Sequence, residues 1–189
     1  KETEEEFKGI YDIYDSDSSI AARTKGVGIL THEDALIYGA CGPHGRASNV
    51  NFDVRKTMPY NSYEDFDFKV ALAEDEDVFS RAVVRLVEIE ESFKIIKQAV
   101  KNMPDGPINL GNKIPRVPKG ESLAVTEAPR GEVSYFVVSN GGQTNSRVNI
   151  HVPTFKNAAT VPVMLKDNTI ADAGLIVASI DPCFSCLDR

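Results

Sequence analysis

The sequence predicts an α+β fold that is mostly helical, with a helix-bundle core, a β-hairpin and irregular loops. The helical part depends on residues 78–102, where apolar residues recur every three or four positions. The hairpin depends on two apolar segments, 133–138 and 148–152, on either side of an Asn-Gly-Gly turn. Glycine, proline and asparagine are dense over residues 40–60, which indicates an ordered irregular loop.

Length and composition limit the possible classes of function. The chain has 189 residues, enough for one good core, and a net charge of −7, which argues against a nucleic-acid partner. No apolar run is long enough to predict a transmembrane helix, and the first residues do not resemble a signal peptide. Two of the three cysteines form a pair, which is typical of a reducing, cytoplasmic setting. The first residue is Lys1 rather than Met, so processing or a longer parent chain is expected.

The first hundred residues predict helices joined by loops. Residues 1–25 are expected to form an acidic helix, a polar break and a short helical turn. Thr31 and Asp34 are spaced as a capping box that opens a short helix ending at Gly39. In the loop over 40–60, charged residues lie among apolar ones, which predicts internally paired charge, and Cys41 is expected to be a small buried residue. The charged residues are Arg46, Asp53 and Arg55.

Residues 66–72 alternate in polarity and predict a strand. The helix predicted over 78–102 carries an apolar seam, which predicts packing against another helix in a bundle. The seam residues are Ala82, Leu86, Ile89, Phe93, Ile96 and Val100. The proline- and glycine-rich residues 104–120 are expected to be a linker, which divides the chain into a helical part, 1–103, and a second part, 121–189.

The second part is expected to hold the hairpin, a C-terminal helix and a metal-binding tail. Residues 160–165 predict a short helix, and Thr169 with Asp172 predicts a capping box that opens an apolar helix reaching Ser179. This helix delivers Asp181 and the cysteine pair, Cys183-Phe184-Ser185-Cys186.

Two thiols three positions apart can point at one soft metal ion. The same spacing occurs in structural zinc half-sites and in thiol–disulfide couples, so the residues alone leave these interpretations open beside a catalytic metal. The pair supplies only two thiolates, and Cys41 and the three histidines show no ligand spacing relative to it. Any metal at Cys183 and Cys186 therefore needs ligands from outside this sequence.

Several stretches, taken in order, resemble the C-terminal half of the large, catalytic subunit of nickel–iron hydrogenases. The resemblance covers essentially the whole chain and is greatest to the membrane-bound, energy-converting type, which is related to the quinone-reductase subunit of respiratory complex I. The final motif is the specific one, because the complex I subunit resembles this tail but lacks its cysteines. The matching stretches are residues 23–28, 42–48, 53–56, 127–132 and 181–186.

The resemblance implies a role for individual residues. Four thiolates hold a Ni–Fe(CN)₂CO centre in the family, two of them from the terminal motif. Cys183 would be the terminal nickel ligand and Cys186 would bridge nickel and iron. Arg130 would lie over the open metal position, where it polarises dihydrogen or acts as a base, and Asp181 would pair with it and orient it. Polar groups of four residues would hold the two cyanides. These residues are Pro129, Arg130, Val152 and Thr154.

The same resemblance implies a function and its partners. The reaction would be 2H⁺ + 2e⁻ ⇌ H₂, with electrons exchanged with an iron–sulfur subunit, whose clusters carry them, and with ferredoxin. The complex would include membrane ion-translocating subunits, with this chain in its cytoplasmic, peripheral arm. The alternative is a complex I-like subunit shaping a quinone or electron-relay interface, its cysteines empty or holding zinc.

Two departures from the family pattern matter. The upstream cysteine pair and a proton-relay glutamate are absent, so we expect the N-terminal half of the site on a separate chain or another portion of the same subunit. The chain stops at Arg189, where relatives are trimmed once nickel is loaded, which favours the mature form. Relatives that end in histidine use it at a magnesium site, and Arg189 in its place leaves a magnesium ion undecided.

Overall fold

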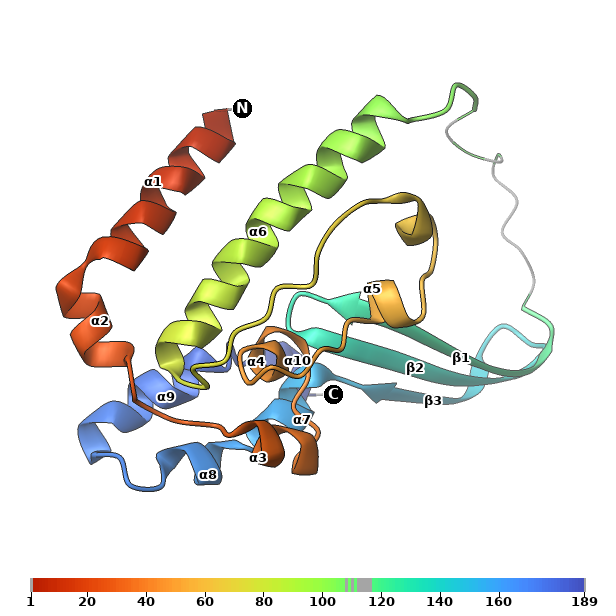
Figure 1. Ribbon diagram of the computed structural model, residues 1–189. Coiled ribbons are helices and arrows are strands. Elements are labelled where there is room, and N and C mark those ends of the chain that lie inside the picture. The colour runs from red at the N-terminus through yellow and green to blue at the C-terminus, as the bar shows by residue number, and fades with distance from the viewer. Residues whose placement is uncertain (1, 108, 110, 112–116, 189) are drawn as a thin grey trace.

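Figure 1 shows the computed structural model of the chain, which describes residues 2–107, 109, 111 and 117–188. The α+β class that the sequence predicts is confirmed, with helices around a three-stranded antiparallel sheet. Part of the predicted linker, 104–120, lies outside the described residues. Arg189 also lies outside them, and so do the predictions on chain maturation and magnesium that depend on it. The longer helices are α1 (Glu2–Ser16), α2 (Ser18–Thr24), α6 (Val78–Lys101) and α9 (Ala173–Ser179). The short ones are α3 (His32–Ile37), α4 (Gly42–Arg46), α5 (Val54–Thr57), η1 (Tyr63–Asp65), α7 (Pro153–Ala158), α8 (Val161–Leu165), η2 (Ile170–Asp172) and α10 (Phe184–Leu187).

The sheet is a meander of β1 (Lys119–Ala128), β2 (Gly131–Asn140) and β3 (Asn145–His151), in that order (Figure 1). The predicted hairpin is confirmed as β2 and β3, with Val137 opposite Val148. Strand β1 was missed, because its first four residues are polar or glycine and show no apolar alternation. It pairs with β2 along its whole length, from Lys119 opposite Asn140 to Ala128 opposite Gly131.

Helix α6 confirms the helix predicted over 78–102 and begins at a capping box. The Asp77 carboxylate accepts a hydrogen bond from the Ser80 N–H at 2.8 Å, and the Ser80 hydroxyl accepts one from the Asp77 N–H at 3.0 Å. The predicted apolar seam is only partly covered. Phe93 packs against Phe7 of α1 with ring centroids 5.8 Å apart, whereas Ile96 remains 57% exposed.

The strand predicted at residues 66–72 is wrong. This segment is extended but has no strand beside it among the described residues; it lies along α6 instead. The Gln98 side chain accepts a hydrogen bond from the Asp67 N–H at 2.9 Å and donates one to its carbonyl at 2.7 Å. The Glu91 carboxylate accepts one from the Lys69 N–H at 2.9 Å. Helix side chains therefore satisfy the backbone groups that a sheet would have paired.

The segments expected to be irregular contain several short helices. Residues 40–60 hold α4 and α5, and Thr31 caps α3 as predicted, with its hydroxyl 3.1 Å from the Asp34 N–H. The second strand of the hairpin, predicted over 148–152, ends at His151: Val152 caps α7, and Pro153 starts that helix, where its missing N–H costs nothing. The capping box predicted at Thr169 and Asp172 does not form: these residues bound the 3₁₀ turn η2, which precedes α9, and the Thr169 hydroxyl donates to the Asp172 carboxylate at 2.6 Å instead of capping a backbone N–H.

The principal core joins segments from both ends of the chain. Leu30, Met164 and Ile176 are fully buried in it, and Val78 at the start of α6 packs with them. Since α8 and α9 are anchored there, the residues directly after α9 have a fixed starting point. The core consists of Leu30, Ala35, Ala40, Val78, Met164, Ile176 and Ile180.

Candidate functional site

Arg130 lies at the tip of the β1–β2 hairpin, in a turn of only two residues between Ala128 and Gly131. Helix α4 approaches this turn so closely that a side chain would not fit between them. A Cβ added to Gly42, whose φ is +65°, would lie 2.3 Å from the carbonyl oxygen of Arg130. Because Gly42 has no side chain, the Arg130 backbone can lie in direct contact with the start of α4.

The hairpin turn presents Arg130 to Asp181, just after α9. The Arg130 Nε donates to the Asp181 backbone carbonyl at 2.7 Å, and Nη2 donates to its carboxylate at 2.9 Å. Asp181 has a φ of +54°, a left-handed conformation that turns both acceptors toward one guanidinium. The structure thus brings together two of the residues that the sequence predicts for the site.

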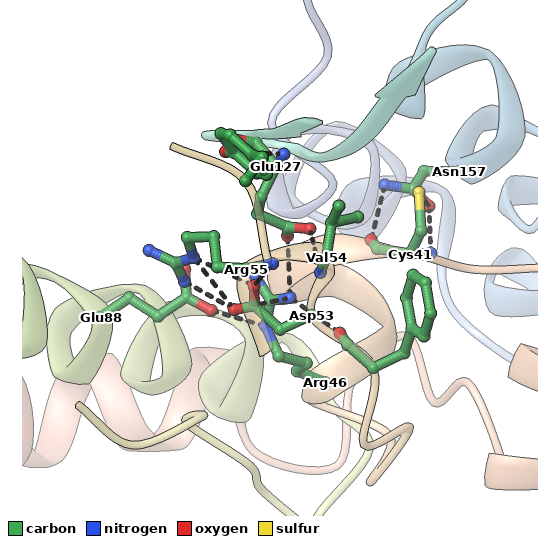
Figure 2. Close-up of polar contacts among 10 residues, drawn as sticks. Cys41, Arg46, Asp53, Val54, Arg55, Glu88, Glu127 and Asn157 are labelled. Carbon is green, nitrogen blue, oxygen red and sulfur yellow. Dashed lines mark hydrogen bonds and ion pairs between the residues drawn. The ribbon is translucent and has the colours of Figure 1, made fainter. Parts of the chain in front are cut away.

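A buried charge network supports the hairpin from below (Figure 2). The Arg46 side chain is 2% exposed, and its guanidinium donates to Glu88 at 2.7 Å and to Glu127 at 2.9 Å. The second oxygen of Glu127 accepts the Val54 N–H at 3.1 Å. Because Glu127 is three residues from Arg130, the network fixes the strand that carries the site arginine.

The network confirms the internally paired charge predicted for the loop over 40–60. Asp53 is buried, its carboxylate lies 2.6 Å from the Arg55 guanidinium, and 3.7 Å separate it from that of Arg46. Burial raises the pKa of Asp53, but the two guanidinium groups outweigh it, so the net pKa is lowered. Glu88 and Glu127 were not predicted as partners; the only sequence signal was Glu127 in a stretch that matches the family.

The two thiols of the tail face each other at the start of α10. The Sγ atoms of Cys183 and Cys186 lie 2.6 Å apart, both cysteines are free, and the Ser185 hydroxyl lies 3.2 Å from Cys183 Sγ. The Cys183 N–H donates to the hydroxyl of Thr154 on α7 at 3.3 Å. Helix α7 and the tail are therefore joined at the cysteine pair.

The surroundings of the three thiols differ. Hydrogen bonds from the Cys186 thiol, the Ser185 hydroxyl and the Cys186 N–H, with the nearby positive charge of Arg130, lower the pKa of Cys183 to about 7. The same contact with Cys183 raises the pKa of Cys186. Burial raises the pKa of Cys41 to about 11, and this residue is buried as the sequence predicts.

The remaining predicted site residues lie close by in the fold. Thr154 is 1% exposed, Val152 is buried at the cap of α7, and Pro129 is exposed beside Arg130 in the hairpin turn. Sequence reasoning missed Asn157, which is also on α7. Its side chain accepts the Cys41 N–H at 3.0 Å and donates to the Cys41 carbonyl at 3.2 Å, joining α7 to α4 (Figure 2).

The donor set fits half of a thiolate metal site. Two adjacent free thiols are soft ligands, whereas a four-coordinate site needs four donors. Among the residues that the structure describes, no group of three or more Cys, His, Asp or Glu side chains could hold a metal ion. The chain can therefore contribute Cys183 and Cys186 to a metal, with further ligands from elsewhere.

A cleft of about 350 Å³, lined by several charged residues, lies beside the pair of Arg130 and Asp181. Arg85 of α6 lines this cleft and also a second, largely apolar one of about 510 Å³ between α6 and α9. Asp181 borders both clefts, so the site is open on two sides within the described structure. Sequence reasoning gave no signal for Arg85, because it lies beside the apolar seam and not in a recognisable motif.

Known proteins similar to this chain include a hydrogenase and subunits of NADH-quinone oxidoreductase. A carbon monoxide-induced hydrogenase of Rhodospirillum rubrum is 44% identical over 180 residues, covering 95% of this chain and 50% of the relative. A subunit of NADH-quinone oxidoreductase from Clostridium beijerinckii is 43% identical over 171 residues, covering 89% and 46%. A subunit of the same enzyme from Thermus thermophilus is 37% identical over 195 residues, covering 88% and 47%. The chain therefore spans about half the length of these relatives.

Two further findings concern membrane-spanning helices and the family of the chain. None of the helices in the described residues is long and apolar enough to cross a membrane. The family model for the 49 Kd subunit of respiratory-chain NADH dehydrogenase matches residues 1–114 and 110–189, which together span the chain. On this match and the identities above, the chain belongs to the family of the 49 Kd subunit of respiratory-chain NADH dehydrogenase, an oxidoreductase family that includes a hydrogenase among its relatives.

Proposed function

We propose that this chain is the C-terminal portion of the catalytic subunit of an energy-converting nickel–iron hydrogenase, which interconverts 2H⁺ + 2e⁻ and H₂. The observation that carries the proposal is the pair of free thiols, Cys183 and Cys186. They begin two residues after Asp181, the residue that holds Arg130. Soft thiolates suit nickel, and a guanidinium fixed by a carboxylate is a donor whose position does not depend on solvent. The 44% identity to a carbon monoxide-induced hydrogenase supports the same assignment.

Each residue has a distinct task in this proposal. Cys183 and Cys186 would each supply a thiolate ligand to a Ni–Fe(CN)₂CO centre. When bound, the centre would supply the redox chemistry of dihydrogen. The Thr154 hydroxyl holds the backbone N–H of Cys183, which fixes the loop that carries the thiol. Backbone N–H, guanidinium and hydroxyl donors around Pro129, Arg130, Val152 and Thr154 would receive the cyanide nitrogens.

Arg130 is held by two bonds to Asp181, so its remaining N–H groups are oriented without the entropy cost of a free side chain. Asp181 is a positioning residue here, because it touches the arginine rather than the reacting atoms. In this proposal the guanidinium acts as an oriented hydrogen-bond donor that polarises dihydrogen, because its two bonds to Asp181 hold it in place.

The proposal includes partners outside this chain. The remainder of the subunit would supply the other two thiolates, an iron–sulfur subunit would pass electrons to ferredoxin, and membrane subunits would couple the reaction to ion transport. The chain would then belong to the peripheral arm of a membrane-bound complex.

Metal content tests the assignment in the assembled complex. Nickel analysis and infrared bands of bound CO and cyanide should be positive for the native protein and lost in Cys183→Ser and in Cys186→Ser. Cys41→Ala is the matched control. The Cys41 thiol is buried at the start of α4, so this variant should leave nickel and both kinds of infrared band unchanged. A native complex that contains only zinc, or that keeps nickel without Cys186, would contradict the proposal.

The alternative is a subunit that shapes a quinone or electron-relay interface without nickel, its cysteines empty or holding zinc. The names of two of the three relatives above, both NADH-quinone oxidoreductase subunits, favour it. Two measurements together separate the two functions. Quinone reduction that persists in the Cys183→Ser complex, with no cyanide bands in the native one, would establish the alternative.

A further inference from the structure

Helix α6 carries a stripe of side chains that the described structure leaves uncovered. Successive residues of an α-helix are rotated by about 100° around its axis, so each contact of α6 can be assigned to a side of the helix. Helix α1 occupies one side, where Phe7 packs on Phe93 and Glu4 pairs with Lys97. Figure 1 shows α1 and α6 running alongside each other.

Two other sides of α6 are also occupied. The extended segment over 66–72 binds Glu91 and Gln98, and the charge network binds Glu88. Between Glu88 and the α1 side lies an open stripe of residues, of which Ile89, Ile96 and Val100 are 41%, 57% and 66% exposed. The open stripe consists of Arg85, Ile89, Ser92, Ile96 and Val100.

Arg85 is the charged member of the open stripe. Its guanidinium makes one hydrogen bond, to the Arg81 carbonyl at 2.8 Å, and no ion pair with any residue in the described part of the chain. Burial lowers the pKa of Arg85, while the nearby carboxylates of Asp181 and Glu88 act in the opposite direction without reaching ion-pair distance. A half-buried guanidinium with no carboxylate in direct contact is costly, so the position favours an incoming acidic group.

The open stripe leads directly to the site. Arg85 lines both clefts, and Asp181, which holds Arg130, borders both as well. The walls of the larger cleft are mostly apolar, with Ala82 and Leu86 from α6 facing Leu175 of α9. An element that filled the stripe would therefore also cover one side of the Arg130–Asp181 pair.

We propose that the open stripe is the docking surface for an amphipathic helix from the part of the family's subunit outside this chain, with a carboxylate of that helix pairing with Arg85. The positions of the open stripe step by three or four residues, which is the spacing at which one helix packs along another, and three of them, Ile89, Ile96 and Val100, are apolar. The relatives carry about as much chain again as this one, which is enough to supply such a helix. This inference depends on the family and not on nickel.

A second copy of this chain is a poorer occupant. Its most acidic helix is α1, and α1 already packs on α6 of its own chain through Phe7, Tyr14 and Glu4. A copy would have to give up those contacts to offer the same helix in trans. A helix from the remainder of the subunit could pack on the open stripe without breaking the contacts between α1 and α6.

The occupant can be identified by photocrosslinking in the intact complex. p-Benzoylphenylalanine replaces Ile96 in the open stripe or, as a matched control, Ile170, an isoleucine that is 96% exposed on η2. We expect irradiation at position 96 to yield a crosslinked peptide from the same subunit outside residues 1–189, several-fold more abundant than from position 170. A crosslink to a second copy of this chain, to a different subunit, or to nothing would overturn the inference.

A charge reversal tests the role of Arg85. Arg85→Glu should lower the amount of assembled complex several-fold, while Arg147→Glu, an exposed arginine on β3, should leave it unchanged. Equal assembly of the two variants would overturn the pairing with a carboxylate. Nickel measured in the same preparations separates the two proposals: a crosslink without nickel removes the hydrogenase assignment only, and nickel without a crosslink removes the docking surface only.

Discussion

At the scale of single residues, the proposed hydrogenase chemistry depends on one guanidinium and its geometry. Arg130 is held by the carbonyl and the carboxylate of Asp181 together. A lysine in its place keeps the charge but offers a single ammonium in place of a planar fork, so it cannot make both bonds and still present oriented donors. The pair is therefore sensitive to shape as well as to charge.

Arg130→Lys should lower hydrogen turnover by about 10²-fold or more, the usual cost of losing an oriented donor next to a reacting group. Nickel content should stay near the native value, because the thiols are untouched. Gas-phase hydrogen measurement with nickel analysis on the same sample checks both. The exposed Arg147→Lys is the control, and a turnover within a few-fold of native in Arg130→Lys would show that the arginine takes no part.

His44 is a second residue whose environment gives a testable result. It is fully buried on α4, its Nε2 lies 2.9 Å from the Thr160 hydroxyl, and its Nδ1 has no partner among the described residues. Burial, and then the nearby charges of Arg81 and Arg85, lower its pKa well below 6.5. The folded protein therefore holds this imidazole neutral where an unfolded chain would protonate it.

The sign of the pH effect follows from that lowered pKa. The unfolded state binds the extra proton, so the free energy of unfolding should fall as pH drops below 6.5, by up to about 1.4 kcal/mol per pH unit. His44→Gln should remove this part of the slope between pH 6.5 and 5, as measured by denaturant unfolding. His151→Gln, an exposed histidine on β3, should keep the slope; identical slopes in both variants would contradict the prediction.

At the scale of elements, the close approach of α4 to the β1–β2 turn positions Arg130. Gly42 and Gly39 have nearly the same left-handed φ, +65° and +66°, but only Gly42 has backbone atoms where a Cβ would be placed. Substituting alanine at either residue imposes the same backbone strain, about 1–2 kcal/mol. The comparison therefore isolates the effect of the contact.

Gly42→Ala should destabilise the protein by about 1–3 kcal/mol more than Gly39→Ala, because the added methyl group must push the turn away from α4. It should also lower turnover, since the turn carries Arg130. Chemical denaturation and activity assays on both variants measure the two effects. Equal stabilities would mean that the turn can move without cost.

At the same scale, the elements that the sequence predicted are those whose signal is local. Helix α6 has a long apolar period and a cap at Asp77, and the β2–β3 hairpin has its Asn140-Gly141 turn. Strand β1 and the extended segment over 66–72 depend on distant partners. The segment at 66–72 alternates as a strand would, yet its partners are Glu91 and Gln98 on a helix, which no local pattern encodes.

At the scale of the whole molecule, the resemblance supplied what local patterns could not. It selected Arg130, Asp181, Thr154 and the cysteine pair from distant parts of the chain, and the structure brings Arg130 to Asp181 and Thr154 to Cys183. Spacing alone would have found only the thiols. Arg85 escaped both routes, because its significance lies in a missing partner within the described residues rather than in any motif.

The charge network around Arg46 joins parts of the chain that are far apart in sequence. It connects α4, the residues before α5, α6 and β1 through Asp53, Glu88 and Glu127 (Figure 2). Removing Arg46 would leave the Glu127 carboxylate buried without a guanidinium partner and Asp53 with Arg55 alone, which is more costly than losing an exposed pair. The network should therefore contribute to stability and to placement of the hairpin at once.

Arg46→Met should lower the free energy of unfolding by about 3–5 kcal/mol, the range for breaking a buried ion pair. Lys97→Met, which breaks the more exposed contact with Glu4, should cost less than about 1 kcal/mol. Denaturant unfolding of the two variants measures the difference. Arg46→Met should also reduce turnover in the fraction that remains folded, because β1 would lose its anchor three residues before Arg130. If Arg46→Met were as stable as Lys97→Met, the prediction would be wrong, because the other three network residues would then hold the hairpin without Arg46.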